Sequence, residues 1–384
     1  MTWFSNKALN RVYLHGAIQT FAETGGGVFL FVFLLKAGVP LPYVLCALAA
    51  INMGRYVLRR FILPVARRIG LRNTLVCGTL LESGSYWLVP WVTGVGPLLY
   101  VWVVVGAVGS VTYWTSYHAY VASTGDNEAR GSQTSVIEAL AGIVSVIAPA
   151  IMTLLLVFAG PKPAFFAVAL VQMLAALPLL GLPSRPIEET VPDRRIMREG
   201  AVFFFIDGWA VALGYYLWSI ALFITLGEQF SVYGGTLVLA GIAGAAMSLL
   251  VGRMIDGGHG GTIAVMAYAA ATAAAVGKAL AVGTPWAAIA ITAAAAMVAA
   301  VQVPVVMARL YNLAQDSGCT LRFNMATEGG WDLGSVTASL LAAALIAAGV
   351  SPATPIWLAI PAFLATGWML HRSYRRDAAG KARV

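Results

Sequence analysis

The chain has 384 residues, of which 60% are hydrophobic and only 10% are charged, and its mean hydropathy is +0.81. Soluble domains carry about 25% charged residues, so this composition excludes a soluble enzyme, a disordered chain and a nucleic-acid-binding module. The net charge of +8 comes from Lys and Arg residues that lie almost wholly between apolar segments, which indicates membrane topology rather than a polyanionic partner. Cys46, Cys77 and Cys319 have neither disulfide nor zinc spacing.

Twelve apolar segments follow one another along the chain, and each is long enough to cross a bilayer, which takes about 20 residues of helix. Breaks such as Gly38-Val39-Pro40 and Gly160-Pro161 separate them. The sequence therefore predicts an all-α membrane protein with spans over residues 10–36, 41–62, 71–93, 96–122, 131–159, 163–182, 199–226, 232–254, 261–283, 285–312, 322–349 and 353–372.

The basic residues predict the orientation of these spans. With a cytoplasmic N-terminus, all but three of the 24 Lys and Arg residues fall on the cytoplasmic side, and the exceptions are Lys36, Lys162 and Lys278. One missing span would reverse every later loop and destroy this asymmetry. We therefore expect both termini in the cytoplasm, and the compact chain favours a bacterial inner membrane.

The two halves of the sequence carry similar features at equivalent places. Arg130 opens the fifth span and Arg322 opens the eleventh, 192 residues later, and each is followed by a buried acid. Six spans per half preserve orientation, so residues 1–182 and 199–384 are predicted to be parallel repeats, joined by a cytoplasmic linker at 183–198 and ending in a short basic tail. This architecture is typical of transporters with a substrate site between the halves.

The predicted topology resembles the major facilitator superfamily, whose inner loops after spans two and eight read roughly G-x-L-A-D-R-x-G-R-R. Leu63 and Arg67 replace the leading Gly and the Asp of the first copy. The matching residues are Ala66, Arg68, Gly70 and Arg72 in the first copy, and Gly252 and Asp256 in the second.

A second, weaker likeness lies in span five. Gly142 and Ala148-Pro149 form a degraded version of the glycine/proline motif common in antiporters of that family. The resemblance to the superfamily implies secondary active transport by rocking of the two halves. It also implies that spans one, four, seven and ten line a central cavity, and that spans two and eleven meet between the halves.

Acidic residues inside predicted spans need a reason, because a charge at the bilayer centre costs about 3 kcal/mol. In span one His15, Gln19 and Glu23 share a helix face, which the resemblance turns toward the cavity together with Asp207 of span seven. A carboxyl group shielded from water exchanges protons near neutral pH, so Glu23 is the predicted proton-coupling site. The alternative is a structural Glu bonded to a neighbouring helix. Asp207, close to its helix N-terminus, equally fits a water-facing position, and Glu82 in peripheral span three is interpreted as structural.

Ion pairs are predicted near the inner ends of the spans. Glu328 and Asp332 share one face of span eleven, and Arg55 of span two reaches a depth similar to that of Glu328, with Arg59 as a further candidate partner. Because the resemblance puts these spans in contact, we expect ion pairs that close the inner side and break when the transporter opens inward. The alternative is a pair within one half that only supports packing. Glu138 and Arg253 are predicted to play the mirror role.

Aromatic residues gather in the fourth and seventh spans. Tyr113, Trp114, Tyr215 and Trp218 lie near mid-membrane and predict a pocket for an amphipathic or aromatic substrate, with core packing as the alternative. His118, near the inner end of its span, is interpreted as a hydrogen-bonded interface residue rather than a ligand. Lys162 and Lys278 are placed at outer span ends, which leaves the cavity poor in positive charge and argues against a strongly anionic substrate.

The sequence contains no Walker loop, nucleophile elbow, H-E-x-x-H motif or paired Cys/His set, so an ATP-driven pump, an enzyme, a metal site and other cofactors are not expected. The predicted function is proton-coupled efflux of a small organic or amphipathic molecule by a monomer whose partners are protons, substrate and the lipid bilayer, with no nucleic acid. The alternatives are a proton symporter importing a small metabolite, a lipid flippase and a non-transporting receptor or scaffold.

Overall fold

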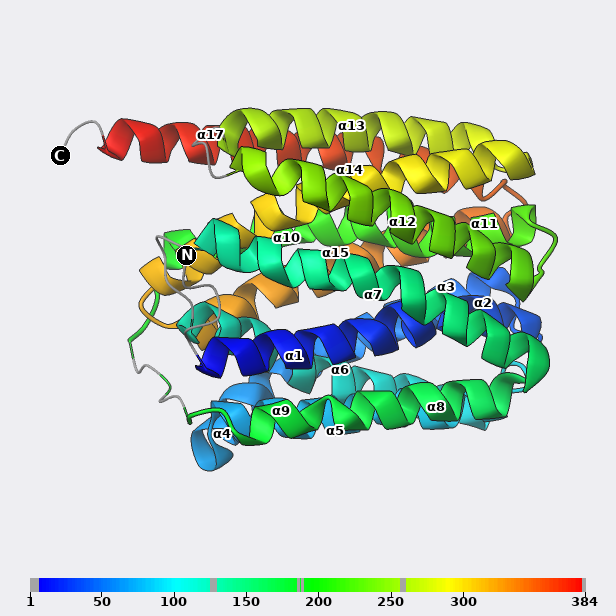
Figure 1. Cartoon of the computed structure of the whole chain (residues 1–384), viewed down its shortest axis with the longest axis horizontal. Helices are drawn as coiled ribbons and strands as arrows, with labels where there is room; N and C mark the ends of the chain where they lie inside the picture. Colours follow the sequence, from blue (N-terminus) through cyan, green and yellow to red (C-terminus); the bar gives the residue numbers. More distant parts are fainter. Residues whose placement is uncertain (1–6, 125–129, 185–186, 188–189, 256–259, 382–384) are drawn as a thin grey trace.

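The fold was taken from a computed structural model, which describes residues 7–124, 130–184, 187, 190–255 and 260–381. The described secondary structure is entirely helical, and long helices lie side by side along one axis (Figure 1). In chain order the helices are α1 (Lys7–Ala22), α2 (Val28–Lys36), α3 (Leu41–Leu58), α4 (Ile62–Ile69), α5 (Leu71–Leu88), α6 (Pro97–Thr124), α7 (Arg130–Phe158), α8 (Pro161–Leu174), α9 (Ala176–Leu180), α10 (Arg194–Val211), α11 (Trp218–Thr225), α12 (Phe230–Ile255), α13 (Gly260–Ala281), α14 (Pro285–Asp316), α15 (Thr320–Ala347), α16 (Ala353–Trp357) and α17 (Ile360–Lys381).

Two π-helical turns interrupt the first and seventh predicted spans at related places: η1 (Glu23–Gly27) joins α1 to α2, and η4 (Ala212–Leu217) joins α10 to α11. Such turns often mark functional positions, because they leave backbone groups outside the regular hydrogen-bond pattern. Gly26 of η1 lies against Val168 and Tyr86, where any side chain would collide with both. The run of three glycines is thus explained by close packing.

Eleven of the described helices or helix pairs are long and apolar enough to cross a membrane. The predicted third span forms α5, which is not among them because Arg72, Asn73 and Glu82 make it more polar than the others. The perimeter of the bundle is apolar: Phe158 and Trp286 are each 82% exposed, as lipid-facing side chains are in a multi-pass membrane protein.

The predicted linker is shorter in the structure. Helix α10 begins at Arg194, inside the predicted 183–198 segment, because the Asp193 side chain accepts a hydrogen bond from the Arg195 amide at 2.7 Å and caps the helix. Gly70 also acts as a boundary: its φ of 84° allows the turn from α4 into α5, which a side chain would strain.

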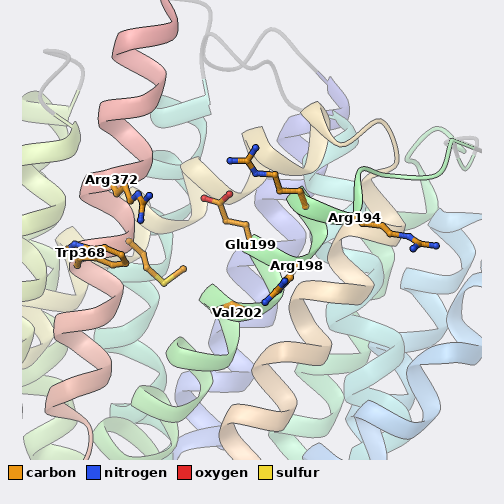
Figure 2. Close-up of a pocket in the computed structure, with 8 residues that line it drawn as sticks. Arg194, Arg198, Glu199, Val202, Trp368 and Arg372 are labelled. Atoms are coloured by element: carbon orange, nitrogen blue, oxygen red, sulfur yellow. The ribbon is translucent and has the colours of Figure 1, made fainter.

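Arginines gather at one end of the bundle, which we call the basic end: α1 and α10 begin there and α4 and α17 end there (Figure 1). A hollow of about 660 Å³ at this end lies between α10 and α17 (Figure 2). Its lining residues are Arg194, Arg195, Arg198, Glu199, Val202, Trp368, Met369 and Arg372.

Helices that precede residue 182 pack closely against helices that follow residue 193. The tightest such pairs are α3 with α15 and α7 with α12. Small residues permit the approach: Gly241 of α12 lies against the backbone of Ser145 in α7.

Candidate functional site

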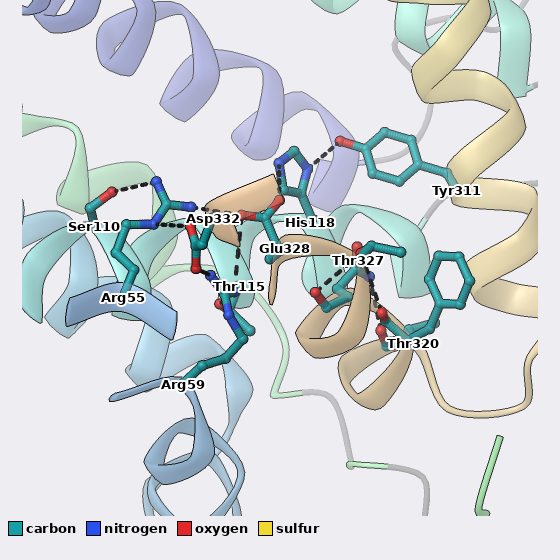
Figure 3. A network of polar contacts seen from close by, with 12 residues as sticks. Arg55, Arg59, Ser110, Thr115, His118, Tyr311, Thr320, Thr327, Glu328 and Asp332 are labelled. Atoms are coloured by element: carbon teal, nitrogen blue, oxygen red, sulfur yellow. Dashed lines mark hydrogen bonds and ion pairs between the residues drawn. The ribbon is translucent and has the colours of Figure 1, made fainter. Parts of the chain in front are cut away.

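Four charged residues join α3 and α15 and form what we call the ion-pair cluster (Figure 3). The Arg55 Nη2 atom lies 2.8 Å from Glu328 Oε2, and its Nε atom lies 2.9 Å from Asp332 Oδ1. Arg59, in the turn after α3, pairs with Asp332 and lies 4.0 Å from Glu328. All four side chains are at most 7% exposed, so two buried cations balance two buried anions.

Hydroxyl groups of α6 accept further hydrogen bonds from these arginines. Ser110 accepts from Arg55 at 3.1 Å and Thr115 accepts from Arg59 at 2.6 Å. His118, also on α6, lies 3.6 Å from Glu328 and bonds the Tyr311 hydroxyl of α14 at 2.9 Å. The structure thus brings together the four residues predicted to pair, across the predicted halves, and includes His118 in their network.

A second polar group, which we call the acid–amide cluster, lies among the helices that precede residue 182. The Gln19 amide donates to Glu23 at 3.0 Å and to Glu82 at 2.8 Å. The Gln172 amide of α8 donates to the Gln19 oxygen at 2.7 Å and to Glu82 at 3.1 Å. No described Lys or Arg lies within 4.0 Å of either carboxyl group. The cluster therefore holds two acids without a paired cation.

One sequence prediction about this region stays open and one needs correction. Helix α5 packs against α6 and α8, and its Glu82 accepts from the same amide that Glu23 uses, so the structural interpretation of Glu82 remains a prediction. His15 does not face a cavity between the halves: its ring bonds the Ala175 carbonyl at 2.8 Å and the Tyr113 hydroxyl at 3.1 Å. Helix α1 turns this face toward α6 and α8, whereas Thr20 and Thr24 lie on its cavity side.

A cavity of about 340 Å³ lies between α1, α7, α11, α12 and α14, and thus between the predicted halves. Tyr215 and Trp218 line it as predicted, together with Gly142 and Pro149 of α7. The other residues predicted for the cavity do not line it: His15, Gln19, Glu23, Tyr113, Trp114 and Asp207. Asp207 instead accepts a hydrogen bond from the Trp331 indole of α15.

The placement of Lys278 at an outer helix end is also corrected. Its side chain lines the cavity, with Nζ 2.7 Å from the carbonyl oxygen of Gly214 in η4. The position is in the last turn of α13, as the sequence predicts, but a long side chain reaches inward along the helix to the Gly214 carbonyl. The cavity is therefore not devoid of positive charge.

Other predicted residues do not join these groups or are only partly described. Arg72 bonds the Leu182 carbonyl at 3.2 Å, Arg68 is exposed, and Gly70 forms the turn between them. Helices contain Glu138, Gly252 and Arg253, but only the backbone of these three is described. Asp256 lies outside the described residues altogether. The predicted pair between Glu138 and Arg253 therefore remains a prediction.

Sequence reasoning missed Gln172, Tyr233 and the inward reach of Lys278. Gln172 had a usable signal, since it is a polar residue in the middle of an apolar span. Tyr233 had none, because an aromatic residue near a span end is common at membrane interfaces. In the structure its hydroxyl donates to the Val28 carbonyl at 3.2 Å. Among the described residues there is no group of three or more His, Cys, Asp or Glu side chains arranged to hold a metal ion.

Solved structures with the same arrangement of helices are transporters. The human organic anion transporter MFSD10 (TETRAN) aligns with a TM-score of 0.68 at 14% identity, over 95% of this chain and 99% of that one. FucP, a Major Facilitator Superfamily transporter in the outward conformation, aligns with a TM-score of 0.67 at 14% identity, over 97% and 99%. A variant of the E. coli fucose:proton symporter FucP gives 0.67 at 13% identity over the same shares. At sequence identities of 13–14%, these similarities establish a shared fold and no more.

Sequence comparison supplies the family. No curated protein matches the chain. The sequence model described as Major Facilitator Superfamily matches residues 43–325, which is most of the chain and includes the ion-pair cluster's arginines and most of the cavity's lining residues. The protein is therefore a secondary transporter that belongs to the Major Facilitator Superfamily.

Proposed function

We propose that the chain exports a small organic or amphipathic molecule by proton-coupled alternating access. In this proposal twelve spans form two six-helix repeats, residues 1–182 and 199–384, and α5 is the third span because it packs along α6 and α8. The gathering of arginines at the basic end supports a cytoplasmic location for that end and for both termini, in a bacterial inner membrane.

The observation that carries the proposal is that two separate features lie between the predicted halves: the ion-pair cluster, which joins α3 to α15, and the cavity beside α7 and α12. At the opposite end the same two groups of helices also touch: Tyr233 bonds Val28, and the Phe29 and Tyr233 rings meet edge to face at 5.4 Å. A cavity with contacts at both ends opens to one side when one set breaks and the other holds. That is the requirement for alternating access.

The acid–amide cluster supports proton coupling. Two partly buried carboxylates that share one amide donor repel each other when both are ionised, and a proton on either relieves the repulsion. The buried Gln172 Oε1 atom has no hydrogen-bond partner, so a protonated carboxyl group in this cluster has an acceptor ready. Glu23 and Glu82 are the proposed proton sites.

Arg55 links this proton site electrostatically to the ion-pair cluster. Arg55 interacts electrostatically with Glu82 as well as with Glu328 and Asp332. Protonation of Glu82 removes one of the negative charges that attract Arg55, and so changes the balance that holds Arg55 on α15. In this proposal the proton thereby shifts the equilibrium between the two open states.

The direction of transport rests on a separate feature. Gly142 and Pro149, the residues of the antiporter-like motif, both line the cavity on α7. This position supports exchange of substrate against protons. The fold likeness to a fucose:proton symporter keeps proton-coupled import as the alternative.

The test uses purified protein in liposomes loaded with a pH-sensitive dye, to which candidate compounds are added from outside. Exchange makes the lumen more alkaline as compound enters, whereas symport makes it more acidic, so the sign of the dye signal distinguishes export chemistry from import. We expect Glu23→Gln to abolish the compound-driven signal and Glu82→Gln to reduce or abolish it.

Glu228→Gln is the matched control, because Glu228 is a half-exposed acid whose partner Lys36 lies 3.9 Å away at the opposite end. It should keep the wild-type signal. An undiminished proton flux in Glu23→Gln overturns the coupling role, and binding of a compound that is never moved favours the receptor alternative.

A further inference from the structure

The described lining of the cavity carries positive charge but no negative charge. Of its described lining residues, Lys278 alone is charged, and the others are aromatic, hydroxyl-bearing, small or aliphatic. A molecule that enters this cavity meets a cation and no carboxylate.

The Lys278 ammonium group is held in place without a counter-charge. Its Nζ atom donates to the Gly214 carbonyl at 2.7 Å, and no described carboxylate lies within 4.0 Å of it. An ammonium group carries three donors, so the contact with Gly214 leaves others for a ligand. A cation in a site shielded from bulk water is costly unless an anion or several acceptors offset it. Among the described residues the protein supplies a backbone carbonyl and no acid.

The walls around Lys278 fit an apolar body. Its Nζ atom lies 5.8 Å from the Trp218 ring, which is fixed by an indole hydrogen bond to Thr292 at 3.2 Å. The facing surface of α14 consists of small apolar residues: Ala295, Ala296, Ala299 and Ala300. The volume of about 340 Å³ lies in the range of small-molecule sites.

From this arrangement we propose that Lys278 selects an organic anion: an amphipathic molecule with one acidic group, which pairs with Nζ, and an apolar or aromatic body against Trp218 and the alanines of α14. A second acidic group has no cation to meet among the described lining residues. The inference rests on the proposed function and names the substrate class for the same cavity.

The test measures binding by calorimetry to the full chain in lipid nanodiscs, with three probes of nearly equal shape: phenylbutyrate, its neutral amide phenylbutyramide, and the cation phenylbutylamine. We expect the carboxylate to bind about tenfold more tightly than the amide, as one charge-assisted hydrogen bond allows, and the amine to bind most weakly. Lys278→Gln should abolish the preference for the carboxylate, and Lys278→Arg should preserve its sign.

Lys162→Gln is the control, because Lys162 forms the other lysine–tryptophan contact, 3.9 Å from the Trp91 ring, outside the cavity lining. It should leave the preference unchanged. Size-exclusion chromatography shows whether each variant is folded. If Lys278→Gln does not fold, the comparison of Lys278→Arg with the wild-type protein still tests the inference.

Equal affinity of the wild-type protein for carboxylate and amide overturns the inference, as does an unchanged preference in folded Lys278→Gln or a failure of phenylbutyrate to bind. The outcome is separate from that of the dye assay. Selective binding of the carboxylate without movement of any compound contradicts the proposed function but supports the anion site. Transport of neutral compounds with no preference for anions supports the proposed function but contradicts the anion site.

Discussion

The ion-pair cluster is fully buried and the acid–amide cluster is partly buried, and they also differ in charge balance and in the helices they join. Arg55 and Arg59 match Glu328 and Asp332, and these residues come from helices before and after the linker. Glu23 and Glu82 have only amides between them, within the first group of helices. A balanced cluster holds elements together with all charges present. An unbalanced one changes its charge most easily, which suits a proton site.

The largest expected effect comes from breaking the balanced cluster. Asp332 is fully buried and contacts both arginines, so Asp332→Asn leaves two cations facing one acid. Loss of one partner from a buried ion pair costs about 3–5 kcal/mol, and we expect thermal or denaturant unfolding in detergent to show a loss of this size. Wild-type stability for this variant would contradict the charge balance described above.

A smaller effect is expected when the balance is kept. Arg55→Gln and Glu328→Gln together leave Arg59 with Asp332, so the double variant should be more stable than the sum of the single variants predicts, by about 1–3 kcal/mol.

The same double variant distinguishes a gate from a packing contact. The assay uses a background in which Cys46, Cys77 and Cys319 are replaced by serine and a Ser145→Cys probe is placed in the cavity. If the cluster is a gate, this probe should react faster in the double variant than with the wild-type cluster when an impermeant maleimide is added at the basic end.

If the double variant labels at the wild-type rate, the cluster supports packing and does not control access. A control probe at exposed Ile69, replaced by cysteine at the basic-end terminus of α4, reports the general reactivity of the sample. Its labelling rate should be the same in all variants.

Acid-to-amide changes in the unbalanced cluster should scarcely alter stability. Glu82→Gln and Glu23→Gln each remove a repulsion and keep an acceptor, so unfolding free energies should stay within about 1 kcal/mol of wild type. Compound-driven proton movement should be lost in Glu23→Gln and reduced or lost in Glu82→Gln. A loss as large as that of Asp332→Asn would show that these acids are ionised structural partners.

The smallest effect is expected at the exposed pair between Lys36 and Glu228. Both side chains are about half exposed and their charged atoms lie 3.9 Å apart, so Glu228→Gln should change stability by no more than about 0.5 kcal/mol. The same unfolding assay measures it. A larger change would mean that burial is not what separates strong from weak ion pairs in this protein.

Much of the fold follows from the sequence, because hydrophobic length and glycine or proline breaks act locally. Each predicted span coincides with a helix or a run of helices, including α7 and α15. The pairing of Arg55 with Glu328 was also predictable, since equal depth in two contacting spans leaves few partners for a buried charge. The boundary of α10 and the low hydropathy of α5 were the exceptions.

The sequence by itself determined the all-helical membrane fold, the family and the residue types that must be buried, since these depend on composition, periodicity and short motifs. Only the tertiary structure decided which face of each helix meets which neighbour. That choice turned Glu23 toward Glu82 rather than the cavity, and brought Lys278 to Trp218. The physical reason is that helix rotation and side-chain reach are set by packing against residues far away in the chain, to which local sequence is insensitive.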